Sequence, residues 1–125
     1  MADYTFSGPD SEFIDEVRAA LAEIDATRIP DGTIEQQRKR VAAPHINNQL
    51  GPDQQNAFDD ALVFYTAEKA FDSWLTTVRF DDADLQIKVN PEHYREGLQE
   101  RTDAVFDRIG ITRPGERATV SWEAL

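Results

Sequence analysis

The chain has 125 residues and no cysteine, and its 24 acidic residues outnumber its 13 basic residues to give a formal net charge of −11 at pH 7. This length suits one domain with its own core, and the lack of thiols excludes disulfides, thiolate zinc sites and cysteine nucleophiles. No apolar run approaches the roughly 20 residues that cross a bilayer, so we expect a soluble protein with no signal peptide and no membrane contact.

The basic residues are ten Arg and only three Lys, and this Asp-rich, Lys-poor composition resembles that of proteins from hypersaline cytoplasm. The simpler alternative is an ordinary acidic protein. In either case the surface repels phosphate backbones, so sequence-specific nucleic-acid binding is not expected. The one basic cluster, Arg38-Lys39-Arg40, is interpreted as a solvated helix face.

A first helix is indicated by Gly8-Pro9-Asp10-Ser11, because proline suits a first helical turn and Asp or Ser can cap it. We expect this helix to run to about Ala26. Its apolar positions recur at three- and four-residue steps and form one stripe, namely Phe13, Val17, Leu21 and Ile24.

A second helix is expected to begin at Ile34, where Thr33 and Gln36 form a capping box, and to end before Gly51-Pro52. Proline inside a helix removes one backbone hydrogen bond and crowds the preceding turn. Because Pro44 lies inside the pattern, we expect a kink between Arg40 and Pro44 rather than two separate helices.

The third helix is predicted from about Gln54 to Val78, with Asp53 as its cap. Between Ala57 and Leu75 apolar residues cover most of the circumference. A helix of this kind is wrapped by other helices, whereas a helix at the surface carries one apolar stripe. It is therefore expected to be the central helix of the protein.

A fourth helix is predicted to begin at Asn90-Pro91 and to close at Gly110. Before it, Leu85, Ile87 and Val89 alternate with polar residues as in a strand. The tail alternates in the same way through Ala118, Val120, Trp122 and Ala124. Exposed strand edges accept partner strands, so we interpret both segments as assembly arms that take a fixed shape only against neighbouring chains. The alternative is that both pack on the helices of their own chain.

The predicted fold class is therefore all-α. It is a four-helix bundle with a long central helix, a short strand or loop excursion between helices three and four, and an extended C-terminal arm. The corresponding divisions are an N-terminal extension (1–10), a helical domain (11–110) and the arm (111–125).

Candidate chemistry is sparse. His45 and His93 lie on different predicted helices and are interpreted as a satisfied side chain at the kink and a surface residue. The acidic cluster of Asp81, Asp82 and Asp84 was compared with an EF-hand loop. The comparison fails because Ile87 stands where the loop needs Gly and His93 where it needs Glu. We therefore expect no enzyme, no metal site and no cofactor.

The order of elements resembles the head–tail connector (adaptor) proteins of tailed viruses. The resembling features are the opening helix Glu12 to Ile24, the segment Ile29-Pro30-Asp31-Gly32-Thr33-Ile34, and Ala61-Leu62-Val63-Phe64-Tyr65-Thr66-Ala67. The long excursion and the Asn90-Pro91…Tyr94 start of the fourth helix, which ends at Ile109-Gly110, also fit. The resemblance covers about residues 11–110, rests on apolar positions and caps, and departs from the family pattern at Pro44.

The resemblance implies a structural protein of the virion, located at the head–tail interface and assembled in the host cytoplasm. Members commonly form a twelve-fold homo-oligomeric ring between the portal protein above and a tail completion or stopper protein below. The ring lines the channel through which viral DNA passes without specific binding. With the composition, this points to a haloarchaeal tailed virus.

Two sets of residues are assigned to assembly. The arm is expected to bind the portal or a neighbouring chain, with Val120 and Trp122 filling a groove; its contact residues are Thr119, Val120, Ser121, Trp122 and Leu125. The excursion is expected to contact adjacent subunits or the channel through Asp81, Asp82, Asp84, Leu85, Ile87 and Val89. The alternatives are a small acidic protein-binding module, a regulator or antitoxin-like protein from a halophile, and a metal-dependent enzyme using the three aspartates.

Overall fold

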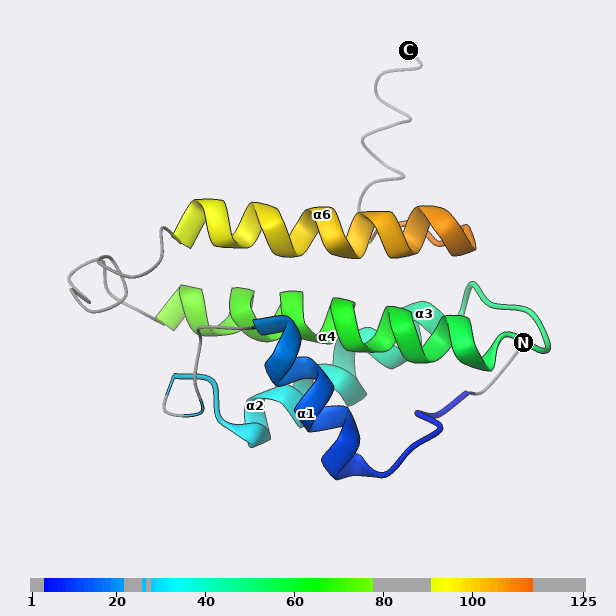
Figure 1. Cartoon of the computed structure of the whole chain (residues 1–125), viewed down its shortest axis with the longest axis horizontal. Coiled ribbons are helices and arrows are strands. Elements are labelled where there is room, and N and C mark those ends of the chain that lie inside the picture. The colour runs from blue at the N-terminus through cyan, green and yellow to red at the C-terminus, as the bar shows by residue number, and fades with distance from the viewer. Residues whose placement is uncertain (1–3, 22–25, 27, 78–90, 114–125) are drawn as a thin grey trace, which may run out of the picture.

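The computed structural model describes residues 4–21, 26, 28–77 and 91–113, and this part of the chain is all-α and contains no strand. The elements in chain order are α1 (Asp10–Leu21), α2 (Asp31–Gln37), the π-helical turn η1 (Arg38–Ala42), α3 (Ala43–Asn47), α4 (Gln55–Thr77) and α6 (Pro91–Ile109). Figure 1 shows α4 at the centre, with α6 antiparallel to it on one side and the remaining helices on the other side.

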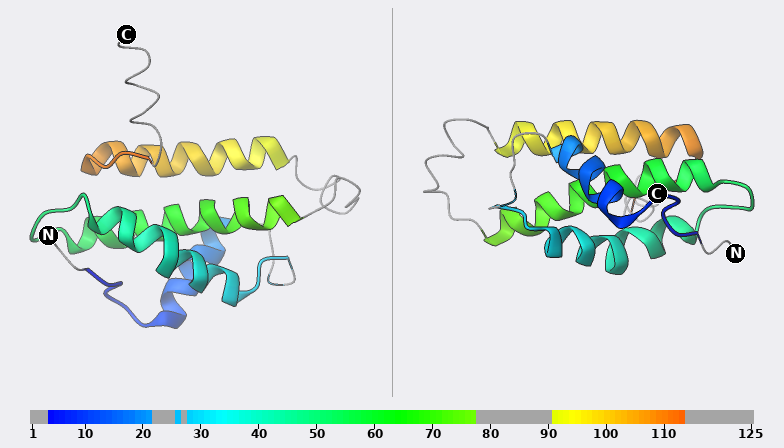
Figure 2. Two further views of the ribbon diagram at one scale, coloured as in Figure 1. Left: turned by 180° about the vertical axis from the view of Figure 1, so that it is seen from behind. Right: turned by 60° about the horizontal axis from the view of Figure 1, so that its bottom comes forward.

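The central helix α4 contacts every other helix, as its apolar sequence predicted. Its buried residues lie on several faces and include Phe58, Ala61, Leu62, Val63, Tyr65, Ala67, Ala70 and Phe71. The two further views agree that α6 covers one side of α4, while α1 and the run from α2 to α3 cover the opposite side (Figure 2). The core therefore has two parts that share α4.

Helix α1 begins where the Gly-Pro-Asp-Ser signal predicted. The carbonyl of Pro9 accepts backbone hydrogen bonds from the first turn, 3.1 Å from the nitrogen of Glu12. Of the predicted stripe, Phe13, Val17 and Leu21 are fully buried, whereas Ile24 lies outside the described residues. Burial of three large apolar side chains is what holds this short helix on α4.

The predicted capping box of the second helix is wrong. Helix α2 begins at Asp31 and not at Ile34, and Pro30 occupies the N-cap position with no side-chain hydrogen bond. Pro30 has an extended backbone (φ −71°, ψ 161°), and its carbonyl accepts from the nitrogen of Thr33 at 3.0 Å. Thr33 therefore already lies in the first turn, where its nitrogen is bonded and its side chain no longer caps the helix.

The irregularity expected near Pro44 is present as one wide turn. The nitrogen of Ala43 donates to the carbonyl of Arg38, five residues back, so η1 is a π-helical turn that leads directly into α3. Proline has no N–H to continue an α-helical ladder, and a π-turn removes the need for one bond at this point. The second helix is thus one continuous helical run from Asp31 to Asn47.

The predicted cap of the third helix is also wrong. Asp53 has a positive φ of 63° and belongs to the turn before α4, so it does not cap the helix. The residue before the first helical position is Gln54, whose carbonyl accepts from the nitrogen of Phe58 at 2.9 Å. The side chain of Gln54 instead closes the turn, because its Oε1 accepts from the nitrogen of Gly51 at 2.8 Å.

Helix α6 ends at the predicted glycine. Gly110 has a φ of +80°, and the nitrogen of Ile111 donates to the carbonyl of Phe106 at 2.9 Å. This bond, from a nitrogen to the carbonyl five residues earlier, is typical of a Schellman motif. The apolar side chains that accompany the motif are Ile111 and Phe106, which are both buried. The motif turns the chain back along the helix, so residues 111–113 run against the body.

The segment before α1 also lies on the body of the protein. Tyr4, Phe6 and the backbone between them pack against α4 and the α2–α3 run. The N-terminal segment from Tyr4 therefore has a fixed place against helices of its own chain. No helix in the described part of the chain is long and apolar enough to span a membrane.

Candidate partner-binding site

The residues assigned to assembly from the sequence all lie outside the described residues. These are Asp81, Asp82, Asp84, Leu85, Ile87 and Val89 of the excursion, together with Thr119, Val120, Ser121, Trp122 and Leu125 of the arm. Among the residues that the structure describes, no group of three or more His, Asp or Glu could hold a metal ion. Two described surfaces are candidates in their place: the base of the arm, and a groove lined by the N-terminal segment, η1, α3 and α4.

The base of the arm is fixed by a buried ion pair. Glu68 projects from the middle of α4, and its side chain is only 1% exposed. Arg113, just beyond the end of α6, donates to both carboxylate oxygens of Glu68 at 2.6 and 2.7 Å. Such a two-pronged pair fixes orientation as well as position, because the planar guanidinium fits the carboxylate in one way.

Helix α6 supplies further partners of this guanidinium. Arg113 donates to the carboxylate of Asp103 at 2.5 Å and to the carbonyl of Gln99 at 2.9 Å. Burial acts to lower the pKa of Arg113, but its hydrogen bonds to Glu68 and Asp103 outweigh this and hold the pKa above its ordinary value. Arg113 is therefore charged at every accessible pH and joins α4 to α6.

A second set of bonds holds the residue before Arg113. The nitrogen and the hydroxyl of Thr112 both donate to Oε1 of Gln49, at 2.8 and 3.0 Å. Nε2 of His45 lies 2.5 Å from the carbonyl oxygen of Thr112 and 3.0 Å from Nε2 of Gln49. His45 is thus a satisfied side chain of α3, packed 5.5 Å from the ring of Tyr65, as the sequence indicated.

The other histidine has the surface position that was predicted. His93 lies in the first turn of α6 with 82% of its side chain exposed, 3.9 Å from the carboxylate of Glu96. The two histidines are on different helices, His45 on α3 and His93 on α6.

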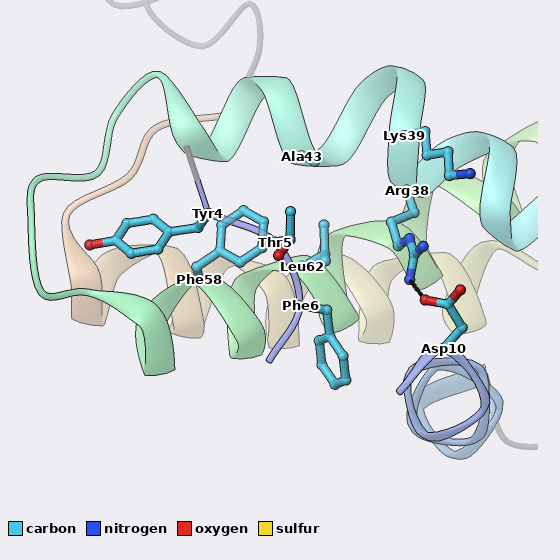
Figure 3. A pocket seen from close by; sticks show the side chains of 9 residues that line it. All are labelled: Tyr4, Thr5, Phe6, Asp10, Arg38, Lys39, Ala43, Phe58 and Leu62. Carbon is cyan, nitrogen blue, oxygen red and sulfur yellow. Dashed lines mark hydrogen bonds and ion pairs between the residues drawn. The ribbon is translucent and has the colours of Figure 1, made fainter. Parts of the chain in front are cut away.

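A groove lies on the side of α4 away from α6. Figure 3 shows its floor, formed by Phe58 and Leu62 of α4 with Ala43 above them, and the N-terminal residues Tyr4 and Phe6 along one edge. The cavity has a volume of about 290 Å³. Phe58 and Leu62 are fully buried beneath it, so its accessible surface belongs to the residues around them.

The N-terminal edge of the groove is firmly attached. The hydroxyl of Tyr4 donates to the carbonyl of Gly51 at 2.8 Å and accepts from the nitrogen of Gln54 at 2.7 Å. The backbone of Tyr4 exchanges two further hydrogen bonds with the side-chain amide of Asn47, at 2.8 and 3.1 Å. Tyr4 therefore joins the end of α3 to the start of α4, and the groove has a fixed edge.

The far end of the groove carries both signs of charge, because Asp10 lines it together with Arg38 and Lys39. Arg38 is 13% exposed, pairs with Asp10 at 3.1 Å and with Glu35 at 3.0 Å, and stacks over the ring of Phe13. The next residue, Lys39, is exposed at the rim and points away from the floor (Figure 3). Lys39 thus offers a positive charge beside an apolar floor, on a protein whose net charge is −11.

An acidic face adjoins the N-terminal segment. Burial raises the pKa of Glu16 above its ordinary value, and the nearby carboxylates of Glu12, Asp59 and Asp60 raise it further. Asp59 is itself engaged, since it accepts from the nitrogen of Ser7 at 3.1 Å and from the Ser7 hydroxyl. This face repels anions.

Sequence reasoning missed both the groove and the ion pair of Arg113 with Glu68, which we call the anchor. Glu68 gave the one usable signal, because a carboxylate inside the apolar run of α4 must find a buried partner. Nothing in the pattern pointed to Arg113, 45 residues away, or to Tyr4 and Asn47, 43 residues apart.

Comparisons of the chain with protein-family models, with curated proteins and with solved structures found no match.

Proposed function

We propose that this chain is a head–tail connector that forms a ring between the portal and the tail of a haloarchaeal tailed virus and lines the DNA channel. The architecture that belongs to this proposal is a four-helix bundle with an excursion at 81–89 and an extended arm from residue 111. The observation that carries it is the anchor at Arg113, which attaches the start of the arm to two rigid helices.

This anchor supports an assembly role because it defines where the arm leaves the body. A binding segment tethered to a rigid point acts at a high effective concentration toward a neighbour held in a fixed position. The acidic face around Glu16 supports the channel role, since a lumen lined with carboxylates repels DNA and lets it pass. Neither feature resembles a catalytic constellation, in keeping with a structural protein.

The test of the ring is the size of the purified chain, measured by light scattering with and without the portal protein of the same virus. The expected result is a large ring, of about the portal's own subunit number, only when the portal is present. A chain that keeps one size with every virion component, but forms a one-to-one complex with another protein, would instead be the acidic binding module. The groove is the feature that favours this second candidate.

The arm and the excursion are tested separately. A variant ending at Gly115 should bind the portal or neighbouring chain more weakly, and Trp122→Ala alone should cost about 2 kcal/mol or more of assembly free energy, as buried aromatic anchors do. Replacing Asp81, Asp82 and Asp84 together by Asn should alter ring formation or genome passage. Unchanged assembly in either experiment removes that segment from the interface. Calorimetric titration with divalent cations tests whether the three aspartates bind metal.

A further inference from the structure

We propose that residues 111–113, the first three of the arm, form a clasp that joins the two halves of the core and opens as one unit about Gly110. The halves are α6 on one side of α4 and the run from α1 to α3 on the other side (Figure 2). The inference rests on the proposed ring and concerns its regulation, because the closed clasp holds the base of the arm on the body. After opening, the arm remains tethered at Gly110, just beyond the end of α6.

The first argument is where the hydrogen bonds of the clasp go. Of the described helices, α4 is the only one with which α6 makes an extensive contact. The hydroxyl of Thr102, for example, donates from α6 to the carbonyl of Phe64 on α4 at 3.3 Å. Thr112 instead bonds to Gln49, just beyond α3: its nitrogen and hydroxyl donate to Oε1, and its carbonyl accepts from Nε2 at 3.2 Å. The clasp therefore links two halves that otherwise meet mainly through α4.

The second argument is that the three residues of the clasp are consecutive and each is attached. Ile111 is buried and bonded to the end of α6, Thr112 is bonded to Gln49, and Arg113 carries the anchor to Glu68. One of them cannot leave the body without moving the next. Gly110 precedes them with a φ of +80°, and a glycine can absorb the backbone change that a hinge requires. Opening is therefore a local event that involves all three residues together.

The third argument is a buried hydroxyl that the closed clasp leaves without a partner. Tyr65 of α4 is fully buried, and its hydroxyl makes no hydrogen bond among the described residues. Its ring lies 5.5 Å from the ring of His45 and 5.3 Å from that of Phe106, and both of these residues bond to the backbone of the clasp. Burial raises the pKa of Tyr65, Glu68 raises it further and Arg113 lowers it, so the hydroxyl lies within the field of the anchor.

This hydroxyl lowers the cost of opening. A buried polar group without a partner is penalised, and the penalty is relieved when water reaches the group. Opening of the clasp admits water to the hydroxyl of Tyr65 and so recovers part of the free energy lost with the hydrogen bonds. The closed clasp is therefore held by many bonds but is not at the greatest stability that its surroundings permit.

The consequence for assembly is a threshold. Opening adds three residues, about 10 Å of extended chain, to the reach of the residues that follow Arg113. A partner that binds only the open state has its apparent affinity reduced by the fraction of chains that are open. The closed clasp thus opposes assembly in the free chain, and binding of the portal draws the equilibrium toward the open state.

The first experiment measures amide hydrogen exchange of the full chain by NMR, without portal. The nitrogens of Ile111 and Thr112 are both bonded in the closed clasp, so they should share one opening equilibrium, easier than that of amides in the middle of α4. Gln49→Ala removes the side chain that bonds to Thr112 and should speed exchange at both amides about tenfold. Faster exchange at Thr112 alone would overturn opening as one unit.

The matched control is the neighbouring residue. Asn48 is exposed and its side chain does not bond to the clasp, so Asn48→Ala should leave exchange at Ile111 and Thr112 unchanged. If Asn48→Ala and Gln49→Ala had equal effects, the end of α3 would be weakened in general, and the assigned contact would be overturned.

The second experiment uses Tyr65→Phe, which removes the unpaired hydroxyl and keeps the ring. The open state then gains nothing from water at this position, so exchange at Ile111 and Thr112 should slow about fivefold or more. Slower exchange in the core of α4 with unchanged exchange in the clasp would mean that the hydroxyl stays dry when the clasp opens. That result would overturn the part assigned to Tyr65.

The third experiment measures ring formation by light scattering as the portal is titrated into the chain. Gln49→Ala should lower the portal concentration required by about the factor by which it speeds exchange in the clasp, and Asn48→Ala should not change it. A required concentration that rises or stays the same with Gln49→Ala would overturn the regulatory role.

Failure here and failure of the proposed function are distinguishable. If the portal induces a ring but Gln49→Ala leaves the required concentration unchanged, the clasp does not regulate assembly and the connector role stands. If both clasp amides respond together but no virion component induces a ring, the clasp stands and the connector role is wrong.

Discussion

Arg113→Ala removes the partner of a buried carboxylate and should be the most destabilising single change on this surface. Glu68 is 1% exposed and would lose two hydrogen bonds of 2.6 and 2.7 Å. Leaving one half of a buried ion pair uncompensated costs about 3–5 kcal/mol. The bond to Asp103 adds little, because that side chain is 53% exposed. Since domains are stable by about 5–15 kcal/mol, the variant loses a large share of its stability.

The measurement is urea denaturation followed by circular dichroism, because urea leaves the ion pair unscreened. The transition midpoint should fall strongly with an unchanged slope. The control is the double variant Glu68→Leu with Arg113→Met, which removes both charges and leaves apolar side chains of similar size. Replacing a whole buried pair in this way is often neutral or stabilising, so the double variant should be much more stable than Arg113→Ala.

Two results would refute this reasoning. A loss below about 1 kcal/mol for Arg113→Ala would show that Glu68 finds water or another cation, such as Lys69 at 4.0 Å, without cost. A double variant as unstable as Arg113→Ala would show that packing of the arginine stem, and not charge compensation, accounts for the loss.

Three further predictions concern other parts of the fold. Gly110→Ala should lower the stability by about 1 kcal/mol because φ is +80° at this position. Gly97→Ala inside α6, where an added methyl meets nothing within 4 Å, should raise the stability by about 0.4–1 kcal/mol. Thermal melts of both variants check this. Tyr4→Phe should cost about 1–3 kcal/mol because the carbonyl of Gly51 and the amide of the residue before α4 lose their partner, and faster amide exchange at the start of α4 should accompany the loss. Glu16→Gln should raise the melting temperature at pH 7 and low salt. The raised pKa of Glu16 means that its ionised form is penalised in the folded state, so the gain should vanish as the pH falls to about the ordinary value of 4.5. A gain that persists at pH 4 would contradict the assignment to a penalty on the ionised carboxylate, which arises from burial and from the nearby carboxylates.

The sequence was sufficient for features that depend on neighbours along the chain. Apolar spacing located the buried faces of Phe13, Val17 and Leu21, and Gly110 marked the end of α6 because only a residue at ease with positive φ closes a Schellman motif. The sequence predicted an irregularity before Pro44 but not a π-turn. The apolar pattern does not show that the N–H of Ala43 donates to the carbonyl of Arg38, five residues back.

The caps and the anchor could not be obtained in this way. Thr33 has the residue type of a cap, but the extended backbone of Pro30 starts the helix earlier and places Thr33 inside the first turn. Arg113 finds Glu68 only because α6 returns antiparallel along α4, which is a tertiary fact. The missed ion pair is therefore set by long-range packing, whereas the two wrong caps follow from the local backbone at Pro30 and Asp53.

The π-turn η1 also explains an oddity in the buried pattern of the second helical run. Ile34 and Ile46 are twelve residues apart, which at about 100° per residue would place them roughly 120° apart around a regular α-helix. Both are fully buried. The wide turn absorbs one residue with little net rotation, which leaves an effective interval of about eleven residues and brings the two side chains to within roughly 20° of each other. A chain one residue shorter at this point would keep both isoleucines inward, but the ring of Pro44 would then collide with a carbonyl four residues back. The extra residue is therefore dispensable only if Pro44 is replaced as well.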